Sequence, residues 1–196
     1  CEYFSRKFTH LSQPVTTGTI EDIYRVAVER ADRRLELLLD RLDLDETWVF
    51  VTADHGESLT EHGIYHDHHG LYDVSVRVPL VVRPPGGLSS QQRTDEFVQL
   101  TDIAPTLMDI AGIEKPAMEG QSLLSFFDDD DSWESRQYIL ADEAYTQRRS
   151  MIRSDEWKLL FRPKDGRAVC RYCNQQHGDT IELFDISSDP DETDNL

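Results

Sequence analysis

The stretch "TWVFVTADHGESLTEHGIYHDHHGLYD", Thr47 to Asp73, decides the predicted fold. Its first seven residues, 47–53, form a compact run of β-branched and aromatic residues. Such a run is typical of a strand that is buried on both faces, as in a parallel sheet between helices. Five of the chain's seven histidines follow directly. In open α/β sheets, ligands bind at the carboxyl ends of the strands, so we expect a functional site where this strand ends.

The flanking segments complete an α/β arrangement. Residues 19–42 carry apolar side chains at three- and four-residue spacing, which predicts a helix with one buried stripe. Residues 76–85 predict the next strand, in which Pro79 favours an edge position or a bulge. Residues 100–112 predict a second amphipathic helix with Asp102 as its cap. A helix followed by a buried strand is half of a doubly wound α/β layer.

The chain changes character after Gly120. Four short strand-like pieces follow at close spacing and predict a small antiparallel sheet: "QYILADE", "RRSMIRS", "EWKLLFRP" and "IELFDI". Strand alternation in the third piece predicts that Lys158 points into solvent. The four Asp of residues 128–131 are typical of a solvated charge run. We therefore expect residues 1–120 to belong to an α/β core and residues 121–196 to form a small C-terminal β subdomain.

Charge and hydropathy exclude several classes of partner. The formal net charge is −18, which disfavours binding to nucleic acid and to anionic membranes. Arg outnumbers Lys sixteen to four, which is compatible with a salt-loving source or with an ordinary acidic protein. No apolar run reaches the roughly 20 residues that span a bilayer. The first residues, "CEYFSRKFTH", contain no apolar signal core and do not begin with Met, so we expect a processed or truncated piece and leave cytoplasmic and secreted locations open.

The histidine-rich segment offers ligands and proton carriers. Asp54 and His55 stand where the strand ends, and a carboxylate beside an imidazole suits a divalent cation of intermediate hardness. Gly56 permits a tight turn and a close backbone approach. The alternative is a turn with a helix-capping Asp. The other four histidines can bind metal, move protons or bind an anion, although exposed histidines usually do none of these.

Five motifs in order resemble the sulfatase family, which is part of the alkaline-phosphatase superfamily. They are "VFVTADHGESLTEHGIYHDHHGLYDVSVRVPLVVRPPGG", "TDIAPTLMDIAGI", "EGQSLL", "SMIRSDEWKLLF" and "IELFDISSDPDETDNL". With the helix that precedes them, they cover the chain from about residue 20 to residue 196. The resemblance implies an alkaline-phosphatase-like parallel-sheet sandwich with helices on both faces, plus a small C-terminal antiparallel sheet. It also implies a sulfuric ester hydrolase that acts on a sulfated small molecule or carbohydrate.

The resemblance also implies roles for particular residues. Asp54 and His55 would bind a divalent cation, usually Ca²⁺ in this family, with Mn²⁺ or Zn²⁺ as alternatives. His68 stands where family members commonly have a Lys that contacts the sulfate and aids the leaving group. It would be the catalytic acid or base and would bind substrate. His66 and His69 are further substrate-binding candidates, whereas His62, in the E-H-G element, is expected to be a structural turn residue.

The family's nucleophile motif, C/S-x-P/A-S-R, is missing. The stretch Cys1 to Arg6, "CEYFSR", has one residue too many and no Pro, so we assign no nucleophile to this chain. The resemblance thus predicts the C-terminal half of a sulfatase, which needs the remainder of the parent chain for a complete site. We expect these residues alone to hydrolyse no sulfate ester.

Other readings stay open. The His in place of Lys is also compatible with a phosphodiester or phosphonate monoester hydrolase, or with a phosphoglycerol-transferase-like enzyme. A non-catalytic acidic binding module is a further alternative. Cys170 and Cys173, with His177, could hold a metal or form a redox pair, but two thiols in a turn are favoured. For Arg77, a structural ion pair is favoured over substrate contact.

Overall fold

The computed structural model describes residues 17–64, 66–88, 93–127, 133–162, 169–171 and 174–196. These residues form two compact units. The first unit comprises the chain up to Gly87 together with Leu140–Leu196, and the second comprises Leu88–Ile139. The predicted domain boundary at residue 120 stays a prediction. The acidic run of residues 128–131, the Cys1–Arg6 stretch and Cys173 lie outside the described residues. No described helix is long and apolar enough to cross a membrane.

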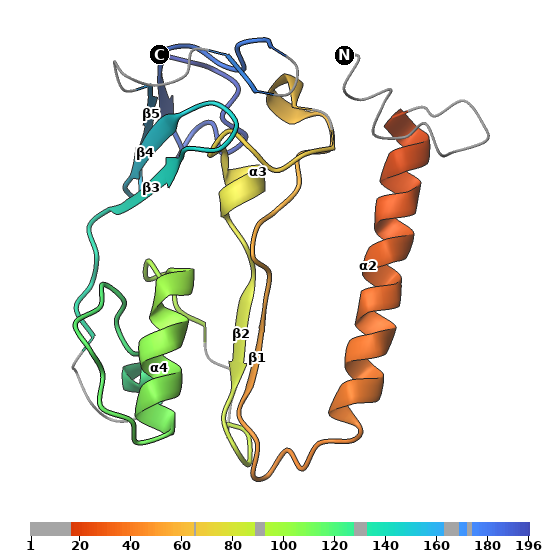
Figure 1. Ribbon diagram of the computed structural model, residues 1–196, viewed down its shortest axis with the longest axis vertical. Helices are drawn as coiled ribbons and strands as arrows, with labels where there is room; N and C mark the ends of the chain where they lie inside the picture. Colours follow the sequence, from red (N-terminus) through yellow and green to blue (C-terminus); the bar gives the residue numbers. More distant parts are fainter. Residues whose placement is uncertain (1–16, 65, 89–92, 128–132, 163–168, 172–173) are drawn as a thin grey trace. The chain divides into compact units, whose positions relative to one another are not determined.

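The predicted first helix is confirmed as α2, Thr17–Leu39 (Figure 1). Its predicted buried stripe is wrong for the described residues. Ile20 is buried, but Ile23 and Leu38 are 50% and 55% exposed. An apolar stripe becomes buried only when another element covers it, and no described helix or strand covers this one.

Strands β1, Val49–Thr52, and β2, Leu80–Arg83, form a two-stranded sheet. They are antiparallel, with Val49 opposite Arg83 and Thr52 opposite Leu80. The expected burial of β1 on both faces is wrong for the described residues, since β1 is only half-buried and Val81 opposite it is 60% exposed. No parallel strand pair occurs in the part of the chain that the structure describes.

The predicted second strand is shorter than expected because a helical turn occupies its start. Helix α3, Asp73–Val76, contains the first residue of the predicted strand. The turn forms because the amides of Ser75 and Val76 donate to the Tyr72 carbonyl. Pro79 stands immediately before β2, where its missing N–H does no harm, and its carbonyl accepts a hydrogen bond from Thr52 at 2.8 Å.

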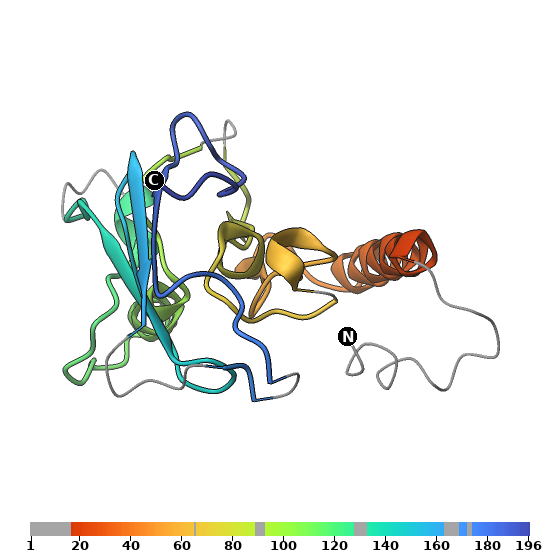
Figure 2. The ribbon, with the colours of Figure 1, turned by 90° about the horizontal axis from the view of Figure 1, so that it is seen from above.

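The predicted C-terminal sheet is confirmed. Its strands are β3, Ile139–Glu143; β4, Arg149–Arg153; β5, Trp157–Phe161; and β6, Ile181–Asp185. Their spatial order follows the chain, and the β4/β5 and β5/β6 pairs are antiparallel. Figure 2 shows this sheet nearly edge-on, with a clear twist. Buried side chains alternate along the strands, as a sheet with one covered face requires.

The expectation that Lys158 points into solvent is wrong. Its side chain is fully buried, and its ammonium group lies 2.7 Å from Asp73 and 2.5 Å from Glu192. The alternation within β5 is as predicted, but Lys158 shares the buried face with Leu160. Two carboxylates from distant parts of the chain compensate the buried charge, as such a charge requires. This ion pair connects the start of α3 to the C-terminal segment.

A second polar cluster fastens the histidine-rich segment to the same sheet. Tyr72 is the last residue of this segment before α3, and its hydroxyl donates to the Glu182 carboxylate at 3.0 Å. Arg149, which is buried, forms an ion pair with Glu182 and places its guanidinium over the Tyr72 ring. Both clusters lie within the first unit, so the sheet sets the position of the segment that follows β1.

The second unit contains the predicted second helix as α4, Ile103–Ile110, after a 3₁₀ turn over Leu100–Asp102. Asp102 is buried and closes a capping box with Gln99. It also forms an ion pair with Arg136 at 2.6 Å. Its side chain does not cap α4 itself, because it caps the preceding turn instead.

Candidate functional site

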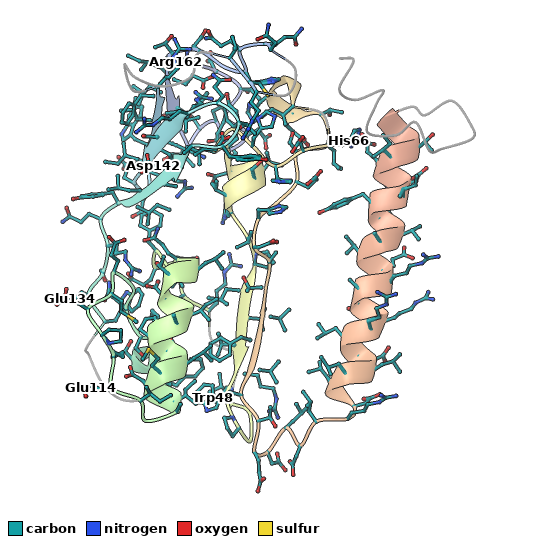
Figure 3. The ribbon with its side chains drawn as sticks, in the orientation of Figure 1. Trp48, His66, Glu114, Glu134, Asp142 and Arg162 are labelled. Carbon is teal, nitrogen blue, oxygen red and sulfur yellow. The ribbon has the colours of Figure 1, made fainter. Side chains whose placement is uncertain are left out.

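The segment between β1 and α3 is a structured loop. Figure 3 labels Trp48 just before β1 and His66 at the opposite end of the β1/β2 pair, so the segment extends beyond the carboxyl end of β1. The Gly56 amide donates to the Ser75 carbonyl at 2.8 Å. A Cβ on Gly56 would lie 2.0 Å from the Val74 carbonyl oxygen, so only glycine allows this approach. Further along, the Ser58 and Asp67 backbones exchange two hydrogen bonds that fold the loop onto itself.

Asp54 and His55 present two ligand atoms to one point. The His55 Nδ1 atom lies 2.8 Å from the Gly56 carbonyl. A carbonyl only accepts, so Nδ1 carries the proton and Nε2 carries a lone pair. Nε2 lies 3.7 Å from Oδ2 of Asp54, and the Asp54 side chain is 89% exposed. The pair is therefore preorganised and open to solvent, as the strand-end position predicted.

His68 lies directly against His55. The two rings are stacked with centroids 3.9 Å apart. Nδ1 of His68 faces two carboxylates, at 3.5 Å from Glu57 and 3.6 Å from Asp67. The His68 side chain is half-exposed.

His55, Glu57 and His68 form a compact set of potential metal ligands, whose ligating atoms lie within 4.8 Å of one another. Sequence reasoning did not identify Glu57. The available signal was its position two residues after His55. The structure thus brings the predicted cation pair and His68 together, and it adds one carboxylate to them.

The other histidines of the segment lie elsewhere. His62 has a left-handed backbone, with φ of 56°, in the turn Glu61–Gly63, and its ring stacks on Tyr72 at 3.6 Å. Burial lowers the pKa of His62, against the raising effect of the Glu182 carboxylate. These observations agree with its expected role as a turn residue. His66 and His69 are both buried, so their predicted contact with substrate stays a prediction.

Arg77 is exposed and has no ion pair among the residues that the structure describes. The expectation of a structural ion pair is therefore wrong for this part of the chain. Arg77 follows α3 directly, and its amide, rather than its guanidinium, contributes to the local structure by donating to the Asp73 carbonyl.

A family model described as N-sulphoglucosamine sulphohydrolase, C-terminal, matches residues 60–196. The chain belongs to the sulfatase family. The match takes in the second half of the histidine-rich loop, α3, β2, α4 and the whole C-terminal sheet. The predicted family, and its C-terminal part in particular, are therefore confirmed.

Curated sulfatase relatives agree with this assignment. The chain is 34% identical to arylsulfatase K from Mus musculus over 82% of this chain and 29% of the relative. It is 27% identical to an N-acetylglucosamine-6-O-sulfatase from Bacteroides thetaiotaomicron, over 88% of this chain and 31% of the relative. The chain thus spans about three tenths of the length of the curated relatives it matches.

Solved structures confirm the predicted α/β fold class. One of them, a protein in complex with its substrate D-glucosamine-2-N,6-O-disulfate, matches with a TM-score of 0.60 and 27% identity, over 85% of this chain and 33% of that one. A phosphonate monoester hydrolase from Silicibacter pomeroyi matches with a TM-score of 0.55 and 24% identity, over 73% of this chain and 29% of that one. At that identity the second likeness shows a shared fold only.

Proposed function

We propose that this chain supplies the C-terminal wall of the active site in a sulfuric ester hydrolase. The observation that carries the proposal is the juxtaposition of Asp54, His55 and His68 at the carboxyl end of β1. The match to a C-terminal sulfatase model supports it. The nucleophile and the remaining cation ligands would come from other parts of a longer enzyme, and residues 1–196 alone would turn over no sulfate ester.

Asp54 and His55 would hold a divalent cation. Two ligands at right angles on Ca²⁺, with bonds of 2.3–2.6 Å, lie about 3.3–3.7 Å apart. The observed 3.7 Å between Asp54 Oδ2 and His55 Nε2 fits this spacing. Ca²⁺ is the ion that the family resemblance implies, whereas the imidazole donor suits Mn²⁺ or Zn²⁺ as the alternative. When bound, the cation would supply Lewis-acid polarisation of a sulfate oxygen.

His68 would face the sulfate ester and act on its leaving group. Glu57 and Asp67 hold its Nδ1 side, so its Nε2 is the nitrogen that can reach a substrate. A protonated Nε2 can donate a hydrogen bond to a sulfate oxygen, or transfer its proton to the leaving oxygen as the S–O bond breaks. Stacking on His55 limits rotation of the ring.

We propose sulfated amino sugars as the substrate class, with aryl sulfates as the second choice. The support is the named activity of one relative, N-acetylglucosamine-6-O-sulfatase, and the disulfated glucosamine bound by one solved neighbour. Arylsulfatase K, in contrast, is named for aryl sulfates. A panel of glucosamine 6-sulfate, N-sulfoglucosamine, an aryl sulfate and an aryl phosphodiester separates these classes.

The test is steady-state kinetics of the full-length enzyme that contains this chain. We expect turnover of at least one sulfate ester and a fall in kcat of about 10²–10⁴ in His68→Ala, the range for loss of a general acid. His68→Lys should restore much of the rate and remove the limb of the pH profile that depends on His68. His62→Phe keeps the ring stack on Tyr72 and serves as the matched control with unchanged kcat. Full activity of His68→Ala, or turnover of the phosphodiester alone, would contradict the proposal.

A further inference from the structure

A second group of potential metal ligands lies apart from the Asp54–His55 pair in the first unit. Its members are His69, Cys170 and His177, which come from two distant parts of the chain. Their ligating atoms lie within 4.8 Å of one another. The His69 and His177 rings are 4.8 Å apart between centroids and tilted by 54°. Cys170 is a thiol and not part of a disulfide.

We propose that His69, Cys170 and His177 form a metal site that takes Zn²⁺. Thiolate and imidazole are both common zinc ligands, and three protein ligands leave a fourth position for another donor. Tetrahedral Zn²⁺, with bonds of 2.0–2.3 Å, needs ligand atoms about 3.3–3.6 Å apart. The ligand atoms lie within 4.8 Å of one another, at most about 1.2–1.5 Å wider than this spacing, a difference that side-chain rotations can close.

The backbone around the group is held in place. The Gln147 side chain, which is buried, accepts from the His177 amide at 3.0 Å and donates to the His177 carbonyl at 3.3 Å. The Cys170 amide donates to the Gln175 carbonyl, and the Asn174 amide donates to the Cys170 carbonyl. Next to His69, the Gly70 amide donates to the Glu143 carboxylate at 3.2 Å. A backbone hydrogen bond, made by the ligand residue itself or by the residue next to it, thus positions each ligand.

Burial and charge also suit a cation here. Cys170 is 2% exposed and His69 is 9% exposed, so a bound ion would be shielded from water and competing ligands. Burial lowers the pKa of His177. The nearby Asp67 carboxylate acts in the opposite sense on that pKa, and its negative charge favours a cation in the vicinity.

The consequence of such a site is structural. His69 belongs to the histidine-rich loop, whereas Cys170 and His177 belong to the segment between β5 and β6. A shared ion would tie the active-site loop to the C-terminal sheet, close to His68. Binding free energy of this kind adds to folding free energy when the unfolded chain lacks the site. The ion would thus help to hold the histidine-rich loop in place. This structural role does not depend on the proposed hydrolase activity.

Cobalt substitution tests the site without any activity assay. The full chain is reduced, stripped with a chelator and titrated with Co²⁺. We expect tetrahedral d–d bands and a thiolate-to-cobalt charge-transfer band at one equivalent. Cys170→Ser should abolish the charge-transfer band, whereas Cys1→Ser, the matched control, should leave it unchanged. His69→Ala and His177→Ala should each weaken affinity by at least about 100-fold, more than the usual loss from removing an outer-shell partner, and His62→Ala should not.

A second measurement needs no variant. Zn²⁺ at one equivalent should slow alkylation of Cys170, which peptide mass spectrometry identifies separately from the other two cysteines. Protection of Cys170 together with the cobalt result establishes the site. A charge-transfer band that survives Cys170→Ser, affinity unaffected by both histidine variants, or unprotected Cys170 would each overturn it.

Discussion

The buried Lys158 provides the sharpest test of the described fold. Its ammonium group is completely buried, and it contacts the carboxylates of Asp73 and Glu192. Replacing Lys158 with Met keeps the length of the side chain but leaves the Glu192 carboxylate without its cation, whereas Asp73 keeps Arg153 at 3.4 Å. Breaking a buried pair in this way costs about 3–5 kcal/mol, because the remaining charge is desolvated and uncompensated. We therefore expect Lys158→Met to lower the free energy of unfolding by that amount.

Lys115→Met is the matched control. Lys115 also lies 2.7 Å from an aspartate, Asp109, but both side chains are about one third exposed. An exposed pair of this kind contributes only about 0–1 kcal/mol. Urea denaturation of both variants, followed by circular dichroism, measures the difference. Equal losses of unfolding free energy in the two variants would show that burial of Lys158 has no energetic consequence and would refute the reasoning.

The loss of unfolding free energy in Lys158→Met should depend on pH in a defined direction. Burial raises the pKa of Glu192, and the Lys158 ammonium group opposes that rise. Without Lys158, the pKa of Glu192 should rise further. A carboxyl with a raised folded-state pKa contributes stability below its unfolded pKa, and that stability is lost as pH rises through the folded pKa. The loss in Lys158→Met should therefore be smaller at acidic pH than at pH 8, and a larger loss in acid would contradict this assignment.

Two further predictions concern the cluster around Tyr72. Burial raises the pKa of Tyr72 to about 12. A spectrophotometric titration should therefore show one of the seven tyrosines ionising near that pH, and Tyr72→Phe should remove this step. The stability that the protonated Tyr72 contributes is present below pH 10 and is lost as the pH rises through its folded-state pKa. Gly178 has φ of 70°, and a Cβ there would lie 2.5 Å from the Tyr72 hydroxyl, whereas Gly63, with φ of 68°, has open space around it. Gly178→Ala should therefore destabilise the fold more than Gly63→Ala by about 1–3 kcal/mol, the usual cost of overpacking, and equal melting temperatures for the two variants would contradict the packing.

Local patterns were sufficient to predict the regular elements. Three- and four-residue apolar spacing predicted α2, and alternating short runs predicted the strands β3 to β6, because both signals lie within one element. The compact apolar run before Asp54 placed β1 and the site at its end. The burial of these elements was predicted less well. Whether α2 or β1 is covered depends on partners that are distant in the sequence, and no periodicity reports them.

The misassigned residues have the same origin. Lys158 is buried because Glu192, more than thirty residues later, and Asp73, far earlier, meet its charge. The association of His69 with Cys170 likewise joins residues about one hundred positions apart. Glu57 was missed for a different reason, since an acidic residue in an acidic chain carries little signal by itself. Asp54, His55 and His68 could be named as candidates because a strand end and a family pattern coincide there, and their roles stay predictions.

The central claim is that Asp54 and His55 form one side of a cation site at the carboxyl end of β1. The most direct measurement is a calorimetric Ca²⁺ titration of the full-length enzyme, compared with its Asp54→Asn and Asp45→Asn variants. Asp45 is an exposed aspartate in the turn before β1 and serves as the matched control. The account predicts that Asp54→Asn weakens affinity at least about 10-fold, or roughly 1.4 kcal/mol, while Asp45→Asn binds as the parent does. Unchanged affinity in Asp54→Asn would contradict it.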